Sequence, residues 1–289
     1  MGTNLLLLLT ACIWGFAFVA QRVGMEYVSP FGFNGIRFAL GALSLLPLLI
    51  RPQRFLQQGS EQSIPHSGRF SLLKRGLIAG FLLFGGSSLQ QVGIVYTTAG
   101  KAGFITGLYV VLVPLIGTIF GTRSGAYRWI GALCAAIGLY FLSVTGDFQI
   151  GRGDFLVFLS AFFFAFHVLY LSRVSPLHDP IPLSILQYGV VSLLSMGTAL
   201  FTETLEIDSF ISAWLPILYG GIFSVGIAYS LQVIAQKKAH PTHAAILLSM
   251  EGLFAALGGA LLLHETFTLR ETFGALLMLG GIILGQWER

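Results

Sequence analysis

The chain has 289 residues, of which 55% are hydrophobic and 10% are charged, and its formal net charge at pH 7 is +4. Soluble domains carry about one quarter charged residues, so this composition excludes an ordinary soluble protein and indicates a polytopic membrane protein. The positive net charge does not indicate nucleic-acid binding, because the basic residues are spread over loops between apolar runs rather than gathered in one patch.

Apolar runs of membrane-spanning length recur along the whole chain. A hydrocarbon core about 30 Å thick requires roughly 20 helical residues at about 1.5 Å rise each. The first run is expected to be a retained helix rather than a cleaved signal peptide, since no basic residue precedes it and no small-residue cleavage site follows it. The sequence predicts an all-α membrane protein with ten transmembrane helices, at residues 5–20, 31–50, 76–95, 102–120, 127–145, 154–172, 181–201, 213–235, 241–263 and 270–286.

The basic residues are divided unevenly between alternate loops. The odd-numbered loops carry four, Arg22, Lys101, Arg152 and Arg270, and Arg37 lies inside an apolar run. By the positive-inside rule, we predict that both termini lie on the cytoplasmic side. The even-numbered loops and the carboxyl-terminal tail carry eleven, namely Arg51, Arg54, Arg69, Lys74, Arg75, Arg123, Arg128, Arg173, Lys237, Lys238 and Arg289.

The two halves of the chain repeat one pattern. Early in each half the offset is 150 residues (160 minus 10), and later it is 143 (274 minus 131). The sequence therefore predicts a duplicated five-helix unit at 4–145 and 154–287. Because five crossings leave the chain on the opposite side, the second copy is predicted to be inverted, an architecture typical of secondary transporters. Matching positions include Thr10 with Ser160, Trp14 with Phe164, Ala17 with His167, and Arg37 with Gln187.

Longer stretches in both halves carry a family pattern. The first half contains CIWGFAFV, YTTAGKAGFITGLYVVLVPLIG and RWIGALCAAIGLYFLS, and the second contains AAILLSMEGLFAALGGALLLHETFTLRETFGALLMLGGIIL. These stretches resemble the paired EamA domains of the drug/metabolite transporter superfamily. From the inverted repeat we expect transport by alternating access. The resemblance implies, most commonly, export of amino acids, related metabolites or toxic compounds, although importers exist. The chain departs from the family pattern where Gly252, instead of proline, follows Glu251, and where His264 stands in place of a glycine before Glu265; glycine can also permit a kink.

Glu251 is the only charged residue between Ala244 and Leu263. A carboxylate near the centre of a bilayer is costly by several kcal/mol unless it faces a polar interior, pairs with a partner or takes up a proton. We therefore predict that Glu251 contacts substrate and couples transport to protons. The alternative is a protonated glutamate that only holds helices together through a hydrogen bond.

Polar and aromatic side chains at helical spacing are expected to line a central cavity. Trp14 and Phe164 occupy matching positions and would stack on a flat or amphipathic substrate; alternatively, they only pack between helices. Glutamines at membrane depth should face inward, because an unsatisfied amide costs several kcal/mol in lipid. The predicted substrate-binding residues are Trp14, Gln91, Tyr109, Phe164, His167, Tyr229, Gln232 and Glu251.

Two further residues are candidates for proton coupling or gating. Arg37 lies about 10 Å inside its apolar run, counted at about 1.5 Å per residue. It either reaches back to the outer interface, lines an outer vestibule, or pairs with a carboxylate such as Glu251. His243 titrates near neutral pH as a free side chain, but its place near the cytoplasmic interface also suits a residue that caps the start of its helix.

Other chemistries leave no motif in the sequence. GxxxxGK[ST], HExxH and GxSxG are absent, so we expect no cofactor, no metal and no enzymatic activity. Cys12 and Cys134 lie in apolar runs and are expected to be packing residues rather than a disulfide or metal site. The expected partners are a small-molecule solute, protons and the bilayer of the inner membrane, with the chain a monomer or homodimer. The alternatives are an importer of a nucleoside, choline-like or sugar-like solute, a membrane enzyme or lipid-handling protein, and a scaffold without transport activity.

Overall fold

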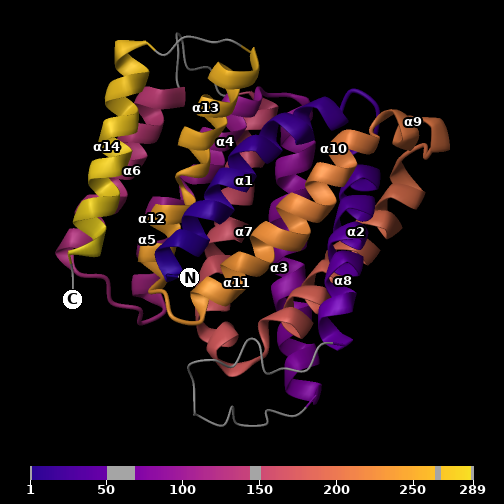
Figure 1. Ribbon diagram of the computed structural model, residues 1–289, viewed down its shortest axis with the longest axis horizontal. Helices are drawn as coiled ribbons and strands as arrows, with labels where there is room; N and C mark the ends of the chain where they lie inside the picture. Colours follow the sequence, from indigo (N-terminus) through magenta and orange to yellow (C-terminus); the bar gives the residue numbers. More distant parts are fainter. Residues whose placement is uncertain (1, 51–68, 144–150, 264–267, 288–289) are drawn as a thin grey trace.

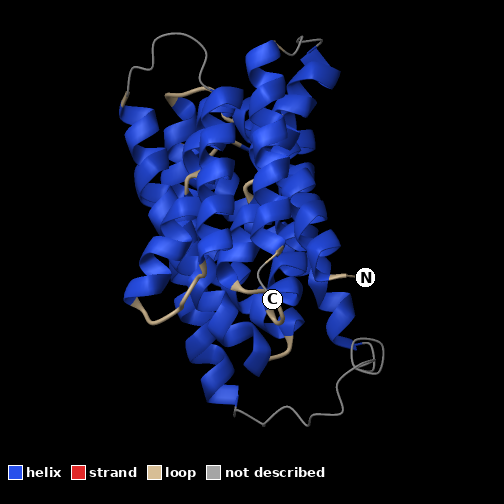
Figure 2. Cartoon of the chain, turned by 90° about the vertical axis from the view of Figure 1, so that its left-hand side faces the viewer, coloured by secondary structure: helices blue, strands red, loops and turns tan. Residues whose placement is uncertain are grey.

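The computed structural model describes residues 2–50, 69–143, 151–263 and 268–287. Helices make up nearly all of these ranges, and no strand occurs within them. The helices run side by side in one bundle in both ribbon views (Figures 1 and 2). In the first half they are α1 (Thr3–Gly24), α2 (Pro30–Ile50), α3 (Arg69–Val95), α4 (Ala99–Gly107), α5 (Tyr109–Ile119) and α6 (Ala126–Ser143).

The second half begins with α7 (Arg152–Val174), a short 3₁₀ turn η2 (Ser175–Leu177) and α8 (Pro180–Thr202). Prolines open α2, α8 and α12, where a missing backbone N–H costs no hydrogen bond. Asp179 caps α8, since its Oδ1 accepts a hydrogen bond from the Ile181 backbone N–H at 3.0 Å. The remaining helices are α9 (Ile207–Ser212), α10 (Trp214–Leu218), η3 (Tyr219–Tyr229), α11 (Ser230–Gln236), α12 (Pro241–Leu248), α13 (Glu251–Leu263) and α14 (Leu269–Gln286).

The apolar helices agree with the predicted runs. Within the described residues, seven helical stretches are long and apolar enough to cross a membrane. Shorter apolar helices occupy the other three predicted runs, at Ala126–Phe141, Pro241–Leu257 and Thr272–Gly285. The prediction of an all-helical membrane protein is confirmed; the count of ten spans and the placement of both termini in the cytoplasm stay predictions.

Two predicted helices are broken near their middle, which corrects the expectation of continuous helices at 102–120 and 241–263. The first break lies at Leu108, between α4 and α5, and the second lies between α12 and α13. Both breaks pack on Leu139 of α6: a Cβ built on Gly107 would lie 2.9 Å from its Cδ1, and one on Gly252 would lie 2.4 Å from its Cδ2. Glycine at each break therefore allows this close packing, and Gly252 does so without the proline of the family pattern.

An eleven-residue π-helical segment, η3, connects α10 to α11 within one span. Such segments are rare and occur mostly at functional sites. The widened turn changes the direction of side chains relative to an α-helix, so residues of η3 do not follow the 3.6-residue period from which a buried face is predicted.

Helices of the two halves pack on each other throughout the bundle. Pairs with extensive contact include α6 with α14, α2 with α8, α3 with α7, α3 with α8, and α1 with α13. At the contact of α6 with α14, a Cβ on Gly131 would lie 2.6 Å from the Gly281 carbonyl oxygen, and one on Gly138 would lie 2.6 Å from that of Gly274. Small residues thus bring the two backbones into contact, as is common between membrane helices.

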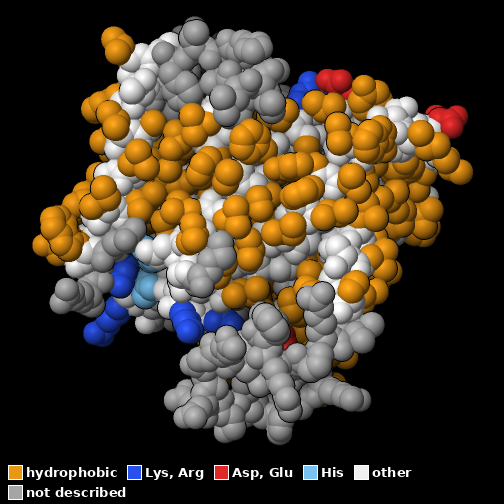
Figure 3. Space-filling view, in the orientation of Figure 1, with side chains coloured by type: hydrophobic (Ala, Val, Ile, Leu, Met, Phe, Trp, Pro, Cys, Tyr) orange, Lys and Arg blue, Asp and Glu red, His pale blue; other side chains and the backbone are white. Residues whose placement is uncertain are grey.

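The outer surface suits a lipid environment. Hydrophobic side chains cover most of the face in Figure 3, while most of the visible Lys and Arg side chains gather near its lower edge. Large apolar side chains such as Leu193 and Ile283 are 76% and 65% exposed, which water would disfavour and lipid tails would not.

Candidate functional site

A cavity lies between helices of both halves, and its lining includes buried charged, polar and aromatic side chains. It leaves about 30 Å³ for the centres of water molecules, room for roughly two waters at about 10–15 Å³ each. We call it the central cavity; its lining residues are Trp14, Phe18, Gln21, Arg37, Gln90, Thr106, Tyr109, Phe164, His167, Val168, Ser224, Tyr229, Gln232, Leu248 and Glu251.

The predicted substrate-binding residues lie around this cavity with one exception. Gln91 is fully buried but does not line the cavity, and neither atom of its amide has a hydrogen-bond partner in the described part of the chain. Gln90 lines the cavity instead, because one residue turns an α-helix by about 100°. Gln90 Nε2 donates a hydrogen bond to Thr106 Oγ1 at 3.0 Å, which joins α3 to α4. The prediction that Gln91 lines the cavity is thus wrong, because the neighbouring residue Gln90 lines it.

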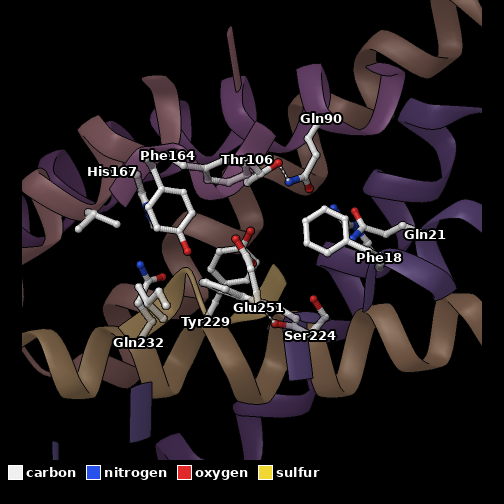
Figure 4. A pocket seen from close by; sticks show the side chains of 15 residues that line it. Phe18, Gln21, Gln90, Thr106, Phe164, His167, Ser224, Tyr229, Gln232 and Glu251 are labelled. Atoms are coloured by element: carbon white, nitrogen blue, oxygen red, sulfur yellow. Dashed lines mark hydrogen bonds between the residues drawn. The ribbon is translucent and has the colours of Figure 1, made fainter. Parts of the chain in front are cut away.

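Glu251 occupies the middle of the site. It is the first residue of α13, immediately after the helix break, and its side chain is 3% exposed. Figure 4 shows Phe18 and Gln21 on one side of it and His167 and Gln232 on the other. Its Oε1 has no hydrogen-bond partner in the described part of the chain. The Tyr109 hydroxyl lies within electrostatic range of this carboxyl group, but short of hydrogen-bond geometry.

Arg37 is also held inside the bundle, with only 2% of its surface exposed. Its Nε donates a hydrogen bond to Asn34 Oδ1 at 2.8 Å, and its guanidinium carbon lies 5.1 Å from the centre of the Phe38 ring. The alternative in which it reaches back to the outer interface is therefore wrong. A direct pair with Glu251 is not formed either; in the described part of the chain, the ion pair within 4.0 Å joins Lys101 to Asp154.

Aromatic rings form the apolar wall of the cavity, with Tyr229 at their centre. The ring centre of Tyr229 lies 4.5 Å from that of Trp14, 6.1 Å from that of Phe38 and 6.5 Å from that of His167. Trp14 Nε1 donates a hydrogen bond to the Ser224 backbone oxygen at 3.2 Å, which fixes the indole against η3. Trp14 and Phe164 therefore both pack between helices and border the cavity; that they stack on a substrate stays a prediction.

The two candidate histidines lie in different places. His167 lines the cavity and is 1% exposed, and its Nε2 lies 2.9 Å from Gln187 Oε1. His243 lies outside the cavity lining, with its Nε2 2.9 Å from Asn4 Oδ1 of α1. The residue that caps α12 is His240, whose Nδ1 accepts a hydrogen bond from the Thr242 backbone N–H at 3.3 Å. His243 is therefore not the cap, and its role in proton coupling stays a prediction.

Several lining residues were not among the predicted ones. Gln21 lies on the same helical stripe as Trp14, seven residues on, and Phe18 lies one turn from Trp14, so helical spacing could have found both. Ser224 lies within η3, whose π-helical turn leaves no periodic signal in the sequence. Cys12 and Cys134 are free and half-buried.

The unpartnered polar atoms of the cavity are mostly acceptors. Gln21 Oε1, Gln232 Oε1 and Glu251 Oε1 are buried without a hydrogen-bond donor from the described residues, and the Tyr109 hydroxyl has no partner either. A buried acceptor left unsatisfied costs about 1–3 kcal/mol. The arrangement therefore suits a guest that supplies hydrogen-bond donors and an apolar or aromatic surface.

The sequence matches the EamA-like transporter family twice, over residues 1–144 and 151–285. The chain belongs to this family. It is a multi-pass membrane protein, as the apolar helices also indicate. The resemblance to the drug/metabolite transporter superfamily is thereby confirmed at the level of the EamA family.

Curated relatives of this EamA protein bear transporter names. It is 35% identical over 284 residues to an uncharacterized transporter of Archaeoglobus fulgidus, which covers 96% of this chain and 83% of the relative. It is 24% identical to the uncharacterized transporter YoaV of Bacillus subtilis, over 95% and 93% of the two chains. It is 23% identical to the uncharacterized inner membrane transporter YedA of Escherichia coli K12, over 89% and 81%. A crystal structure with 17% identity matches 98% of this chain and 95% of its own with a TM-score of 0.76, which shows the shared fold.

Proposed function

We propose that this EamA protein is a secondary transporter that exports small metabolites, such as amino acids or drug-like compounds, across the inner membrane by alternating access. The family and the names of the relatives support a transporter, and the name of the E. coli relative supports the inner membrane. The proposal includes ten spans, two inverted repeats at 4–145 and 154–287, and cytoplasmic termini. Export rests on the family resemblance alone.

The observation that carries the proposal is the buried Glu251 carboxyl group at a helix break, which forms no ion pair within the described residues and lies inside a cavity shared by both halves. Discontinuous helices near the midplane of the membrane are a recurring way to build solute sites in transporters. The buried acceptors Gln21, Gln232 and Glu251 favour a solute with an amino group. The rings of Trp14 and Tyr229 favour a solute that also has a flat or apolar part.

The size of the cavity bears on the mechanism. Sites for small molecules usually measure about 300–1,000 Å³, whereas this cavity leaves about 30 Å³ for the centres of water molecules. We infer that the structure represents a closed conformation and that helices must separate before a solute enters. The breaks at Leu108 and before Glu251, together with η3, are places where helices can bend without losing a full set of backbone hydrogen bonds.

Glu251 is the proposed proton-coupling residue. A carboxyl group that binds a protonated amine when ionised and a proton when the amine leaves exchanges one for the other, so the proton gradient can drive the solute outward. Arg37 lines the same cavity and is the proposed gating residue. His243 remains a candidate for proton passage toward the cytoplasm, since it lies on α12, the helix that precedes Glu251.

A counterflow screen tests this function. Purified protein in liposomes is loaded with one unlabelled amino acid, amine, nucleoside or sugar, and uptake of its labelled counterpart is followed. We expect exchange with amino-group solutes that carry an apolar or aromatic part. Exchange of nucleosides or sugars alone would contradict the proposed solute class and favour the importer alternative. Chemical conversion of a solute would favour a membrane enzyme, and silence with folded protein would favour a scaffold.

A further inference from the structure

A second hollow lies at the beginning of α3 and shares no residue with the central cavity. The volume that the centres of water molecules can occupy in it is about 450 Å³. We call it the basic hollow; it is lined by Phe70, Ser71, Lys74, Arg75 and Ile78 of α3 and by Tyr170 of α7.

Tight packing on the opposite face of α3 fixes the walls of the basic hollow. A Cβ on Gly76 would lie 2.7 Å from Leu186 Cβ, and one on Gly80 would lie 2.5 Å from Val190 Cβ, so α3 is pressed against α8. Tyr170 packs against a buried apolar cluster that includes Leu171 and Leu183. The hollow is therefore bounded by well-packed helices.

The charge of the basic hollow is positive. Lys74 is exposed and Arg75 is half-buried, and among the described residues that line the hollow there is no carboxylate. Arg75 Nη1 lies 2.9 Å from His178 Nε2. Burial, and then the positive charge of Arg75, lower the pKa of His178, which lies between two apolar spans. The imidazole is therefore neutral at pH 7, and it orients the guanidinium as a hydrogen-bond acceptor without cancelling its charge.

The rim of the basic hollow is apolar. Phe70 is 80% exposed, and Leu73 and Leu77 are 44% and 40% exposed on the same helix. Cations beside an exposed apolar helix face suit a molecule with an anionic head and hydrocarbon tails. A soluble phosphate would use the cations but leave Phe70 and Ile78 without a partner.

We propose that the basic hollow binds the phosphate of an anionic phospholipid, with Lys74 and Arg75 contacting the phosphate oxygens and the acyl chains lying along Phe70 and Ile78. Arg75 is suited to paired contacts with phosphate oxygens, and Tyr170 contributes a hydroxyl at the wall. The charge arrangement favours phosphatidylglycerol over phosphatidylcholine, because a choline head adds a positive charge next to two cations. The proposal does not depend on transport activity.

Lipid binding to the purified full-length protein in neutral detergent tests this site, with native mass spectrometry used to count bound phosphatidylglycerol or phosphatidylcholine. Each of Lys74→Ala and Arg75→Gln should weaken phosphatidylglycerol binding about 5-fold, and the double variant about 25-fold, from about 1 kcal/mol per basic residue. Lys238→Ala, an exposed change just beyond α11, is the matched control and should have no effect.

Three results would overturn the proposal. They are equal binding of the two lipids by the parent protein, equal weakening by the Lys238 control, and displacement of the lipid by millimolar glycerol phosphate, which would assign the hollow to a soluble phosphate. Thermal unfolding without added lipid checks that the variants fold. Lys74→Ala alone is sufficient for the test if Arg75→Gln loses stability with its His178 contact.

Discussion

Leu139 is predicted to hold both helix breaks in place, and a double-mutant cycle with Gly252 measures this. Leu139 is fully buried. It packs on Gly107 at the first break and on Gly252 at the second. Leu139→Ala should cost about 2–5 kcal/mol, as is typical for a buried leucine. Gly252→Ala in the parent protein forces a methyl group to 2.4 Å from Leu139 Cδ2. The resulting overpacking costs about 1–3 kcal/mol and exceeds the gain of up to about 1 kcal/mol in helix propensity.

The sign of the Gly252→Ala effect should reverse once Leu139 is shortened. In the Leu139→Ala background, the new methyl group fills part of the space left by the leucine and gains about 0.8 kcal/mol by burial, besides the helix propensity. The helix-propensity gain is the same in both backgrounds, so the coupling free energy is the overpacking cost plus the burial gain, about 2–4 kcal/mol. Unfolding by titration of a denaturing detergent in mixed micelles measures each corner of the cycle. Equal destabilisation by Gly252→Ala in both backgrounds would refute the role given to Leu139.

Three further predictions concern stability, each measured by thermal unfolding in neutral detergent. Asn34→Ala removes the acceptor for Arg37 Nε and the donor to the Ser87 backbone oxygen, and should cost about 1.5–3 kcal/mol. Asn34→Asp keeps the acceptor but loses the donor, so it should lose less, and an equal loss would assign the stabilisation to the Ser87 bond instead of the Arg37 bond. Gly138→Ala places a Cβ 2.6 Å from a backbone oxygen of α14 and should cost about 1–3 kcal/mol, whereas Gly189→Ala, with nothing within 4 Å, should be neutral or stabilising; the same loss in both would contradict the close contact of α6 with α14. Because the pKa of folded His178 lies below its ordinary value, the unfolded chain takes up the proton first, so stability should fall as the pH drops below about 6.5. His178→Gln should reduce this dependence, and an unchanged pH profile of stability would contradict the role given to His178.

Sequence alone predicted the helical runs because a membrane-spanning segment has a length and an apolar content that few other structures share. It could not predict the break before Glu251, because Gly252 only permits a break and the neighbour that occupies the space, Leu139, is distant in the sequence. The π-helical turn of η3 likewise has no periodic signature, so Ser224 was missed at the cavity.

Most of the cavity lining was predictable because polar groups inside a membrane helix are costly and therefore usually face a cavity or a partner rather than lipid. The error of one residue between Gln90 and Gln91 shows the limit, since both are buried polar residues and only the rotation of α3 decides which one faces the cavity. The position of Arg37 was open between the interface and the interior. Asn34, three residues earlier on the same helix face, was the available signal that its guanidinium has a partner inside the bundle.

The measurement that tests the account most directly is counterflow by Glu251→Gln, with and without a pH gradient, using the solute that exchanges best with the parent protein. Glu26→Gln, which changes an exposed glutamate just after α1, is the matched control. We predict that Glu251→Gln lowers exchange at least about 10-fold and removes its dependence on the pH gradient, because a neutral amide can neither pair with an amine nor release a proton, while the control behaves as the parent. An unchanged rate with an unchanged pH dependence would contradict the role of Glu251 in solute binding and proton coupling.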